Sequence, residues 1–366
     1  MKDLGPAPRN SAGMSVVDGI EIYTSKKENV MNRMFKLIVL SLILVFAAAA
    51  VFAGGQGEKG SDEEGFVIGW SNAGMGDSWR QFLVSNFEAA VAANPEITDY
   101  YITNADEKPE KQIADIEDLL IKGVDALIIY PTVGEAIIPA IERAYDSGIP
   151  VILFGGNIDT DRYTSLVMQD LLEFGKAQAE WLADELEGRG KIVMLSGIAG
   201  NTTAEDRLAG AREVFQQYPG IEILDHQYCD WSPPKAKSIM ETMIQAFPEI
   251  DGMWADSGLM SWPALQAMKE AGRELPPSTG DQLNGYAKFL VDNAVRGYCY
   301  PMTTQLSGKA VDVAVQALKG QKVDKIVYID IDGYGPEEIA DLVQPDKSDW
   351  WWIGDDQMPE EFLPEL

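Results

Sequence analysis

Aromatic and hydrogen-bonding side chains gather where apolar, strand-like segments of this sequence come to an end. The apolar run 149–154 ends at Gly155-Gly156-Asn157, and the run 124–130 ends at Pro131-Thr132. Loops at the carboxyl ends of parallel strands line ligand crevices. We therefore expect one cleft, lined by the polar and aromatic residues at these strand ends: Trp79, Arg80, Tyr130, Asn157, Arg207, Trp231, Asp256, Ser257, Asp281 and Gln305.

The chemistry of this set fits a polyhydroxylated ligand. Sugar hydroxyls are bound well by Asp, Arg, Asn and Gln side chains, which offer two hydrogen-bonding atoms each. A sugar also presents an apolar C–H face, which a flat aromatic ring can cover, and Trp79 and Trp231 suit that need. A single Trp is ordinarily a packing residue, but these two lie beside polar strand ends in different halves of the chain.

The motifs of the common enzyme classes are missing. The only histidine, His226, lies inside a predicted strand without a serine elbow, so it is expected to be structural. Gly-x-Ser-x-Gly, Gly-x-Gly-x-x-Gly after the first strand and the phosphate-binding Gly-x4-Gly-Lys-Ser/Thr are absent. Asn157-x-Asp159-x-Asp161 imitates a calcium loop, but Arg162 and Met168 stand where Gly and Glu are needed. We expect no metal and no cofactor.

Composition limits the possible partners. The chain has 366 residues, which is enough for two domains. It is 46% hydrophobic and 24% charged, as in ordinary globular proteins. A net charge of −29 argues against nucleic acid and against anionic membrane surfaces, both of which attract Lys and Arg.

The N-terminal region has the order of a secretory signal peptide. A basic segment at 32–36 is followed by an apolar run at 37–53 that closes with Ala50-Val-Phe-Ala53. We expect a signal peptide over 31–53, cleaved near Ala53, and export to the periplasm without stable membrane insertion afterwards. The alternative is a retained anchor, since the run is at the short edge of a spanning helix. Residues 1–30 are expected to be a mis-called upstream extension, and 54–65 to be a flexible tether.

The rest of the chain alternates between strand-like and helix-like segments. That alternation predicts an α/β fold with parallel sheets covered by helices on both faces. The expected strands are 66–71, 100–103, 124–130, 149–154, 165–168, 190–196, 221–228, 250–255, 279–281, 298–303 and 325–332. The expected helices between them are 79–93, 109–122, 135–147, 171–187, 203–218, 234–247, 259–272, 286–296 and 307–319.

Two features lie outside this alternation. The C-terminal tail (residues 336–366) is rich in Pro, Asp and aromatic residues, and Trp350-Trp-Trp352 is expected to pack back onto a lobe. The two cysteines, Cys229 and Cys299, could form a disulfide in an exported protein, but their spacing does not decide whether they pair.

From Phe66 to about Asp332 the sequence resembles the periplasmic sugar-binding proteins of the ribose/galactofuranose type, which are subunits of ABC importers. The matching stretches are Ile68-Gly-Trp-Ser71 with Ser78-Trp-Arg80, Gly123 to Thr132, Gly148-Ile-Pro-Val-Ile152, Gly197 to Arg207, Ala264 to Gly272, and Thr304-Gln305.

The resemblance implies the periplasmic binding protein type 1 fold, with two Rossmann-like lobes joined by a three-strand hinge. It places residues 66–168 plus 306–325 in the N-terminal lobe and 169–304 plus 326–335 in the C-terminal lobe. The implied function is that of a monomeric solute-binding protein, not an enzyme. It would close on a monosaccharide or polyol and deliver it to an ABC permease. A chemotaxis or signalling sensor with the same fold is the main alternative. An exported carbohydrate-active enzyme or a sugar-responsive repressor fits less well.

The resemblance also assigns roles to particular positions. It places Trp79 and Trp231 as the two stacking aromatics and Arg80 as a contact that follows the first of them. Arg207 and Asp281 are placed as hydroxyl-binding residues and Gln305 as a hinge residue.

Three departures from the family pattern concern the same pocket. Tyr130 and Ser257 stand where the family usually has Asn. Gly155-Gly156 stand where ribose binders carry Asp-Arg, so a strong ionic pair is missing. We expect these glycines to open space beside the ligand and Asn157 to supply hydrogen bonds in place of the lost pair.

Overall fold

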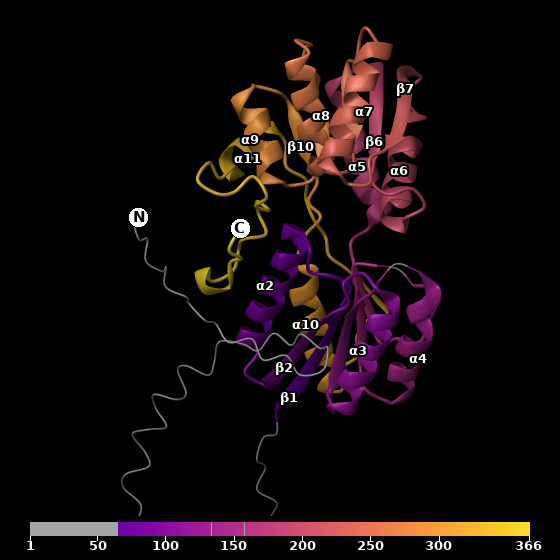
Figure 1. Ribbon diagram of the computed structural model, residues 1–366, viewed down its shortest axis with the longest axis vertical. Helices are drawn as coiled ribbons and strands as arrows, with labels where there is room; N and C mark the ends of the chain where they lie inside the picture. Colours follow the sequence, from indigo (N-terminus) through magenta and orange to yellow (C-terminus); the bar gives the residue numbers. More distant parts are fainter. Residues whose placement is uncertain (1–64, 133, 157) are drawn as a thin grey trace, which may run out of the picture.

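The computed structural model describes residues 65–132, 134–156 and 158–366. The predictions for residues 1–30, for the signal peptide at 31–53 and for nearly all of the tether lie outside the described residues, as does Asn157. The described chain forms two lobes, one above the other in Figure 1. Each lobe has a parallel sheet of its own, as the alternating pattern predicts.

The first lobe contains a six-stranded sheet in the order β11-β5-β4-β3-β1-β2, with neighbouring strands parallel. Its strands are β1 (Phe66–Asn72), β2 (Ile97–Asn104), β3 (Ala126–Tyr130), β4 (Val151–Phe154), β5 (Ser165–Met168) and β11 (Ile326–Tyr328). All four residues of β4 are buried, which fits a strand in the middle of a sheet that is covered on both faces.

Helices cover both faces of this sheet and form separate apolar cores. On one face, α2 (Ser78–Ala93) and α10 (Leu306–Leu318) pack against each other and against the strands. On the other face lie α3 (Pro109–Ile121), the short 3-10 helix η1 (Glu135–Ile137) and α4 (Ile138–Asp146). Because α10 belongs here although it comes late in the sequence, the first lobe is built from two distant parts of the chain.

The second lobe contains a five-stranded parallel sheet in the order β10-β9-β8-β6-β7. Its strands are β6 (Arg189–Ser196), β7 (Gly220–Tyr228), β8 (Gly252–Ala255), β9 (Ser278–Gly280) and β10 (Gly297–Cys299). One face is covered by α5 (Leu171–Glu185) and α6 (Thr202–Phe215). The other is covered by α7 (Pro233–Ala246), α8 (Gly258–Glu270) and α9 (Asn284–Asp292).

The chain passes between the lobes after β5, after β10 and after β11. The first two crossings are tied together by Gln169. Its side-chain amide donates to the Pro301 carbonyl at 2.8 Å, and its oxygen accepts from the Thr303 amide at 3.0 Å. A buried side chain thus holds two hinge segments side by side.

The last strand corrects one of our assignments. Residues 326–335 were expected in the C-terminal lobe, but β11 pairs with β5 in the first lobe. The reason is that α10 packs on β3, β4 and β5, so the chain that leaves it returns to the open edge of the same sheet. The residues that follow β11 reach the second lobe, where Gly333 lies against Tyr298 and Tyr334 forms an antiparallel bridge with Cys299.

The C-terminal tail contacts both lobes rather than one. Its helix α11 (Pro336–Leu342) packs on α9 and β10 of the second lobe. Its short 3-10 helix η2 (Glu360–Phe362) lies against α2 of the first lobe. Figure 1 shows the tail running beside the hinge from one lobe to the other.

Cys229 and Cys299 are both free and buried. Cys299 lies on β10 and Cys229 follows β7, at opposite edges of the second sheet. Burial raises the pKa of Cys229 to about 12, so its thiol stays protonated. Within the described ranges, no helix has both the length and the apolar composition needed to span a membrane.

Candidate functional site

Three candidate residues of the first lobe lie together at the ends of α2 and β3. Asp77 caps α2, its carboxylate accepting from the Arg80 amide at 2.9 Å, and this cap places Trp79 and Arg80 in the first helical turn. Tyr130 is the last residue of β3. Its ring centroid lies 5.9 Å from that of Trp79, and the Arg80 guanidinium lies 5.9 Å from the centre of the same ring. The strand end and the helix start therefore build one aromatic wall.

Arg80 is held by acidic residues of its own lobe. It forms ion pairs with Asp77 and, at 2.8 Å, with Glu107. Burial lowers the pKa of Arg80, but the charges of Asp77, Tyr130 and Glu107 outweigh that effect and leave it raised. Its Nε atom is buried and has no hydrogen-bond partner within the described part of the chain. One donor of this residue is therefore unused.

Tyr130 fills the space that we expected Gly155 and Gly156 to open. A Cβ atom added at Gly155 would lie 2.7 Å from the Tyr130 ring, and Gly155 has φ of +72°. The ring also stacks on Phe154, with centroids 5.3 Å apart. The expectation of open space at this position is therefore wrong: a tyrosine ring lies where a side chain at 155 would otherwise stand.

The second lobe contributes Arg207 from α6, and this residue is only 2% exposed. Its guanidinium donates to the Asp256 carbonyl at 3.1 Å and lies 3.8 Å from the centre of the Phe174 ring. A Cβ atom added at Gly175 would lie 1.8 Å from the Arg207 carbonyl, so a residue without a side chain lets α5 and α6 approach closely. The Nε of Arg207 is buried and unpaired among the described residues.

Asp256 fixes the second candidate tryptophan. One carboxylate oxygen of Asp256 accepts from the Trp231 indole at 2.9 Å, and the other accepts from the Gly197 amide at 3.0 Å. Trp231 itself has φ of 50° and lies over Gly197, where an added Cβ would be 2.1 Å from its ring. Each oxygen of Asp256 thus accepts one of these bonds, and through the first of them the residue positions Trp231.

Ser257 and Asp281 meet at the start of α8. Ser257 caps the helix by accepting from the Leu259 amide at 3.2 Å, and Asp281 accepts from the Gly258 amide at 2.8 Å. The positive end of the helix dipole stabilises a carboxylate at a helix N-terminus. Burial nevertheless raises the pKa of Asp281 to about 6, against the lowering effects of Ser257, Gly258 and Arg207.

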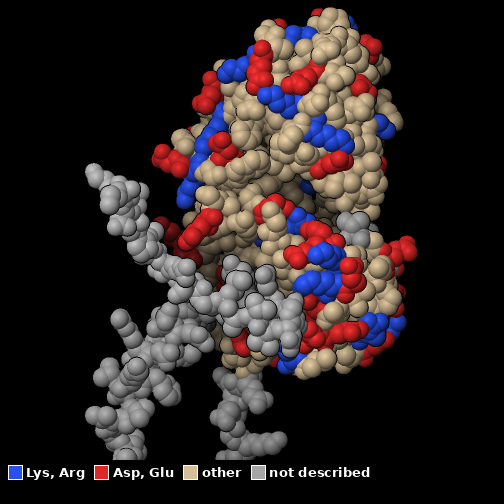
Figure 2. All heavy atoms as spheres, viewed as in Figure 1, with Lys and Arg blue, Asp and Glu red and all other residues tan. Residues whose placement is uncertain are grey.

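The two sets face each other across the lobes. Burial raises the pKa of Tyr130, and the positive charges of both Arg80 and Arg207 oppose that rise, so Arg207 acts on a residue of the other lobe. Trp79 packs against apolar clusters of both lobes. Figure 2 shows the surface indented between the lobes, with acidic and basic side chains interspersed around it. The structure thus brings eight candidates together: Trp79, Arg80, Tyr130, Arg207, Trp231, Asp256, Ser257 and Asp281.

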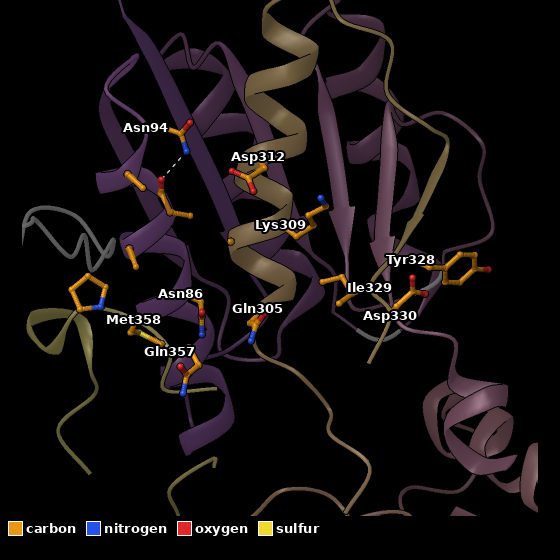
Figure 3. Close-up of a pocket in the computed structure, with 15 residues that line it drawn as sticks. Asn86, Asn94, Gln305, Lys309, Asp312, Tyr328, Ile329, Asp330, Gln357 and Met358 are labelled. Carbon is orange, nitrogen blue, oxygen red and sulfur yellow. Dashed lines mark hydrogen bonds between the residues drawn. The ribbon is translucent and has the colours of Figure 1, made fainter. Parts of the chain in front are cut away.

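Gln305 stands apart from this cluster. It is exposed and precedes α10, and it lines a hollow of about 580 Å³ between α2, α10 and the tail. Figure 3 shows it there with Asn86 and Gln357. No hydrogen bond or ring contact in the described part of the structure joins Gln305 to the other candidates, and its backbone amide is bound by the Thr303 hydroxyl.

Some residues of the site were not among the sequence-based candidates. Glu107 lies in the polar loop after β2, from which no candidate was chosen, and Phe174 lies inside α5, where no strand end marks it. Asp256 was recognised as a strand-end residue, but its role in holding Trp231 depends on a contact 25 positions away. The strand-end signal finds residues at the cleft but not their partners.

The positive and negative charges of the candidate site are balanced. Arg80 is paired with acids of the first lobe, and Arg207 lies in the field of Asp256 and Asp281 of the second. Burial lowers the pKa of Arg207, while those two carboxylates raise it. Among the described residues, no group of three or more His, Cys, Asp or Glu side chains is arranged to hold a metal ion.

The sequence profile of the family described as "Periplasmic binding protein domain" matches residues 68–322, which is more than half of the chain. The chain belongs to this family. The match covers both lobes and ends before the C-terminal tail.

Relatives of this periplasmic binding protein include a ribose import binding protein of Bacillus subtilis. It is 26% identical over 79% of this chain and 95% of its own length. Among solved structures, the arabinose-binding component of an ABC transporter from Shewanella sp. ANA-3 is 29% identical, with a TM-score of 0.68 over 75% of this chain and 93% of its own. The fructose-binding periplasmic domain of a hybrid two-component system is 28% identical, with a TM-score of 0.67 over 76% and 93%.

These comparisons confirm the predicted fold, two lobes of the periplasmic binding protein type, and the predicted class of sugar-binding periplasmic proteins. The relatives are binding proteins rather than enzymes. The family includes components of importers and of sensors, so both uses are represented among proteins similar to this chain.

Proposed function

We propose that this protein is an exported solute-binding protein. It captures a neutral monosaccharide or polyol between its lobes and delivers it to the permease of an ABC importer. One observation carries the proposal: a buried, charge-balanced polar set on the second lobe faces an aromatic wall on the first. Arg207 and Asp281 supply a donor and an acceptor for hydroxyl groups, while Trp79 and Tyr130 offer flat apolar surface.

The paired charges favour a neutral ligand over an anion. An anionic ligand needs uncompensated positive charge, but Arg80 is neutralised by Asp77 and Glu107. Arg207 is balanced by the nearby Asp256 and Asp281. What remains available is hydrogen bonding: the buried Nε atoms of both arginines have no partner in the described structure. Unpaired buried donors are costly, and a hydroxylated ligand would satisfy them.

Binding would proceed by closure about the hinge, which brings contacts from both lobes onto the ligand at once. Trp79 and Trp231 would cover C–H faces from opposite lobes. A ligand at micromolar Kd is bound by about −8 kcal/mol. A few charge-assisted hydrogen bonds and two stacking contacts are enough for an affinity of that order.

A sensor role is the second candidate, because one similar structure is the fructose-binding domain of a two-component system. Uptake of a radiolabelled sugar by cells with and without the gene separates the two. An importer subunit is required for accumulation at low sugar concentration. A sensor is required only for a transcriptional or motile response, and its loss leaves uptake unchanged.

The binding proposal is tested by a thermal-shift panel of D-ribose, L-arabinose, D-fructose, D-galactose, xylitol and myo-inositol. A member present at 100 times its Kd adds about 2.7 kcal/mol to the free energy of unfolding, which gives a clear upward shift in Tm. Asp281→Ala and Trp79→Ala should each abolish that shift while the unliganded variants remain folded. Binding that survives both substitutions contradicts the site, and hydrolysis of a panel sugar without any shift contradicts the function.

A further inference from the structure

The C-terminal tail, which lies beyond the segment matched to the family, reaches into the region between the lobes. Its Trp352 forms an antiparallel bridge with Leu283, and the Ile353 amide donates to the Gln282 carbonyl at 3.0 Å. These contacts place the tail against Gln282 and Leu283, which directly follow the candidate ligand-binding residue Asp281 in the chain. The tail is therefore part of the site's surroundings and not a peripheral appendage.

Asp355 of the tail is a buried acceptor for three donors. One oxygen accepts from the Gln282 side chain at 3.0 Å and from the Thr304 amide at 2.8 Å, and the other accepts from the Thr303 hydroxyl at 2.8 Å. Asp355 is only 3% exposed. Thr303 and Thr304 belong to the second crossing and Gln282 to the second lobe, so one carboxylate joins these two segments to the tail.

The same network continues to the stacking residue Trp79. The Gln282 amide group brackets Met302, accepting from its backbone amide at 2.9 Å and donating to its carbonyl at 3.3 Å. That Met302 carbonyl accepts from the Trp79 indole at 2.9 Å. Asp355, Gln282 and Met302 thus form a continuous path of hydrogen bonds from the tail to the aromatic wall of the first lobe.

The tail also holds the start of α2 from a second direction. The indole of Trp352 donates to the Ser78 hydroxyl at 2.9 Å, next to Trp79 in sequence. Trp351 packs edge-on against Phe82 of the same helix, with centroids 4.9 Å apart. The position and the plane of Trp79 therefore depend on residues that lie outside the family's matched segment.

We propose that Asp355 is a positioning residue of the ligand site: it fixes the Met302 carbonyl and thereby the ring plane of Trp79. The expected effect of Asp355 on ligand affinity depends on the function proposed above. A stacking ring that is held before the ligand arrives loses less freedom on binding, and such preorganisation raises affinity. The alternative is that Asp355 only stabilises the fold.

The experiment compares Asp355→Asn with Asp356→Asn. Asp356 is the adjacent residue, and its carboxylate is bound by Gln344 and Trp351, both within the tail. It is therefore a matched control that does not touch the hinge. The readout is the 1H–15N cross-peak of the Trp79 indole in the unliganded protein, assigned by its loss in Trp79→Phe. A merely stabilising residue would lower Tm without moving this peak.

We expect Asp355→Asn to shift the Trp79 indole peak and to weaken binding of the panel sugar with the largest thermal shift by about tenfold or more. Asp356→Asn keeps an acceptor oxygen for Gln344 and Trp351 and should leave both the peak and the affinity unchanged. If Asp355→Asn does not fold, Thr303→Val can be used instead. It removes one of the three donors to Asp355 and should shift the Trp79 indole peak by a smaller amount. An unmoved indole peak in a folded Asp355→Asn or Thr303→Val variant overturns the proposal. If the unsubstituted protein binds no panel sugar, that result counts against the proposed function. The position of the Trp79 indole peak is measured without ligand, so it still tests the role of Asp355.

Discussion

At the scale of single residues, two departures from the family pattern, Tyr130 and Gly155, depend on each other. Tyr130 and Gly155 were identified separately in the sequence, on different strands. In the structure the Tyr130 ring lies against Gly155 at a distance that leaves no room for a side chain there. The aromatic wall therefore requires a glycine at position 155, whereas the tyrosine ring places no such constraint on Gly156.

This coupling predicts the outcome of a double-mutant cycle. Gly155→Ala should destabilise the protein by about 1–3 kcal/mol, because φ of +72° is strained for alanine and because the new methyl group would lie 2.7 Å from the Tyr130 ring. In a Tyr130→Ala background the steric part of this cost disappears. The coupling energy should then be on the order of 0.5–3 kcal/mol, as is usual for residues in contact. Urea denaturation of the four proteins measures it.

Gly156→Ala is the matched control. A Cβ at Gly156 would lie 3.2 Å from the Pro131 ring, and this glycine is not among those with positive φ. We expect Gly156→Ala to lower the free energy of unfolding by a smaller amount, and by the same amount with or without the Tyr130 ring. Equal effects at the two positions with no coupling would show that the contact does not constrain Gly155.

At this scale the sequence predicts which residues reach the cleft but not what holds them. Trp231 and Asp281 were found because they follow apolar, strand-like runs. Asp256, which binds Trp231, and Gln282, which binds Met302, act through contacts that no local pattern encodes. Gln305 was expected at the cleft and, from the resemblance, at the hinge; it directly follows the second crossing, and its side chain is exposed at a hollow beside α2 and α10.

At the scale of elements, local periodicity predicted the strands and helices well but not which sheet the last strand joins. The three residues of β11 carry no information about their partner, because any open sheet edge can accept a parallel strand. Its place was decided by α10, whose apolar face packs on the first lobe. The tail was harder still: its aromatic content indicated packing, but not that it would contact α2 as well as α9.

The tail's packing predicts unequal roles for neighbouring tryptophans. Trp351 is 3% exposed and contacts Phe82 across the lobe boundary, so Trp351→Ala should cost about 3–5 kcal/mol of unfolding free energy. Trp350 is 44% exposed and packs only on Trp262 within the described structure, so Trp350→Ala should cost less than about 1 kcal/mol. Guanidinium denaturation monitored by circular dichroism gives both values. Similar losses in the two variants would mean that the tail is not anchored through Trp351.

For the whole molecule, sequence reasoning reached the two-lobed class but not the way the lobes are held together. The contacts that join the start of α2 to the hinge and to the tail are made by residues separated by more than 200 positions in the chain. Two buried carboxylates, Asp281 and Asp355, lie in this region where the lobes, the hinge and the tail meet. Their ionisation should therefore affect the free energy of unfolding of the whole protein.

The unfolding free energy should fall as pH rises from about 4 to about 7. Burial raises the pKa of Asp281 and of Asp355 to about 6, whereas an unfolded Asp titrates near 3.9. Between these values the folded protein holds more protons than the unfolded chain, so stability is highest below the lower pKa and is lost as pH rises through the upper one. Each group contributes up to about 3 kcal/mol.

Other groups titrate in the same window, so the test uses differences between proteins. Burial lowers the pKa of His226, which contributes with the opposite sign, while Glu249 is an exposed ion-pair partner and adds little. Urea denaturation at pH 4, 5, 6 and 7 should show the decline in the unsubstituted protein. Asp281→Asn and Asp355→Asn should each remove part of it, because a side chain that cannot ionise has no charged form to bury. Unchanged slopes in both variants would mean that burial does not hold either carboxylate in its protonated form.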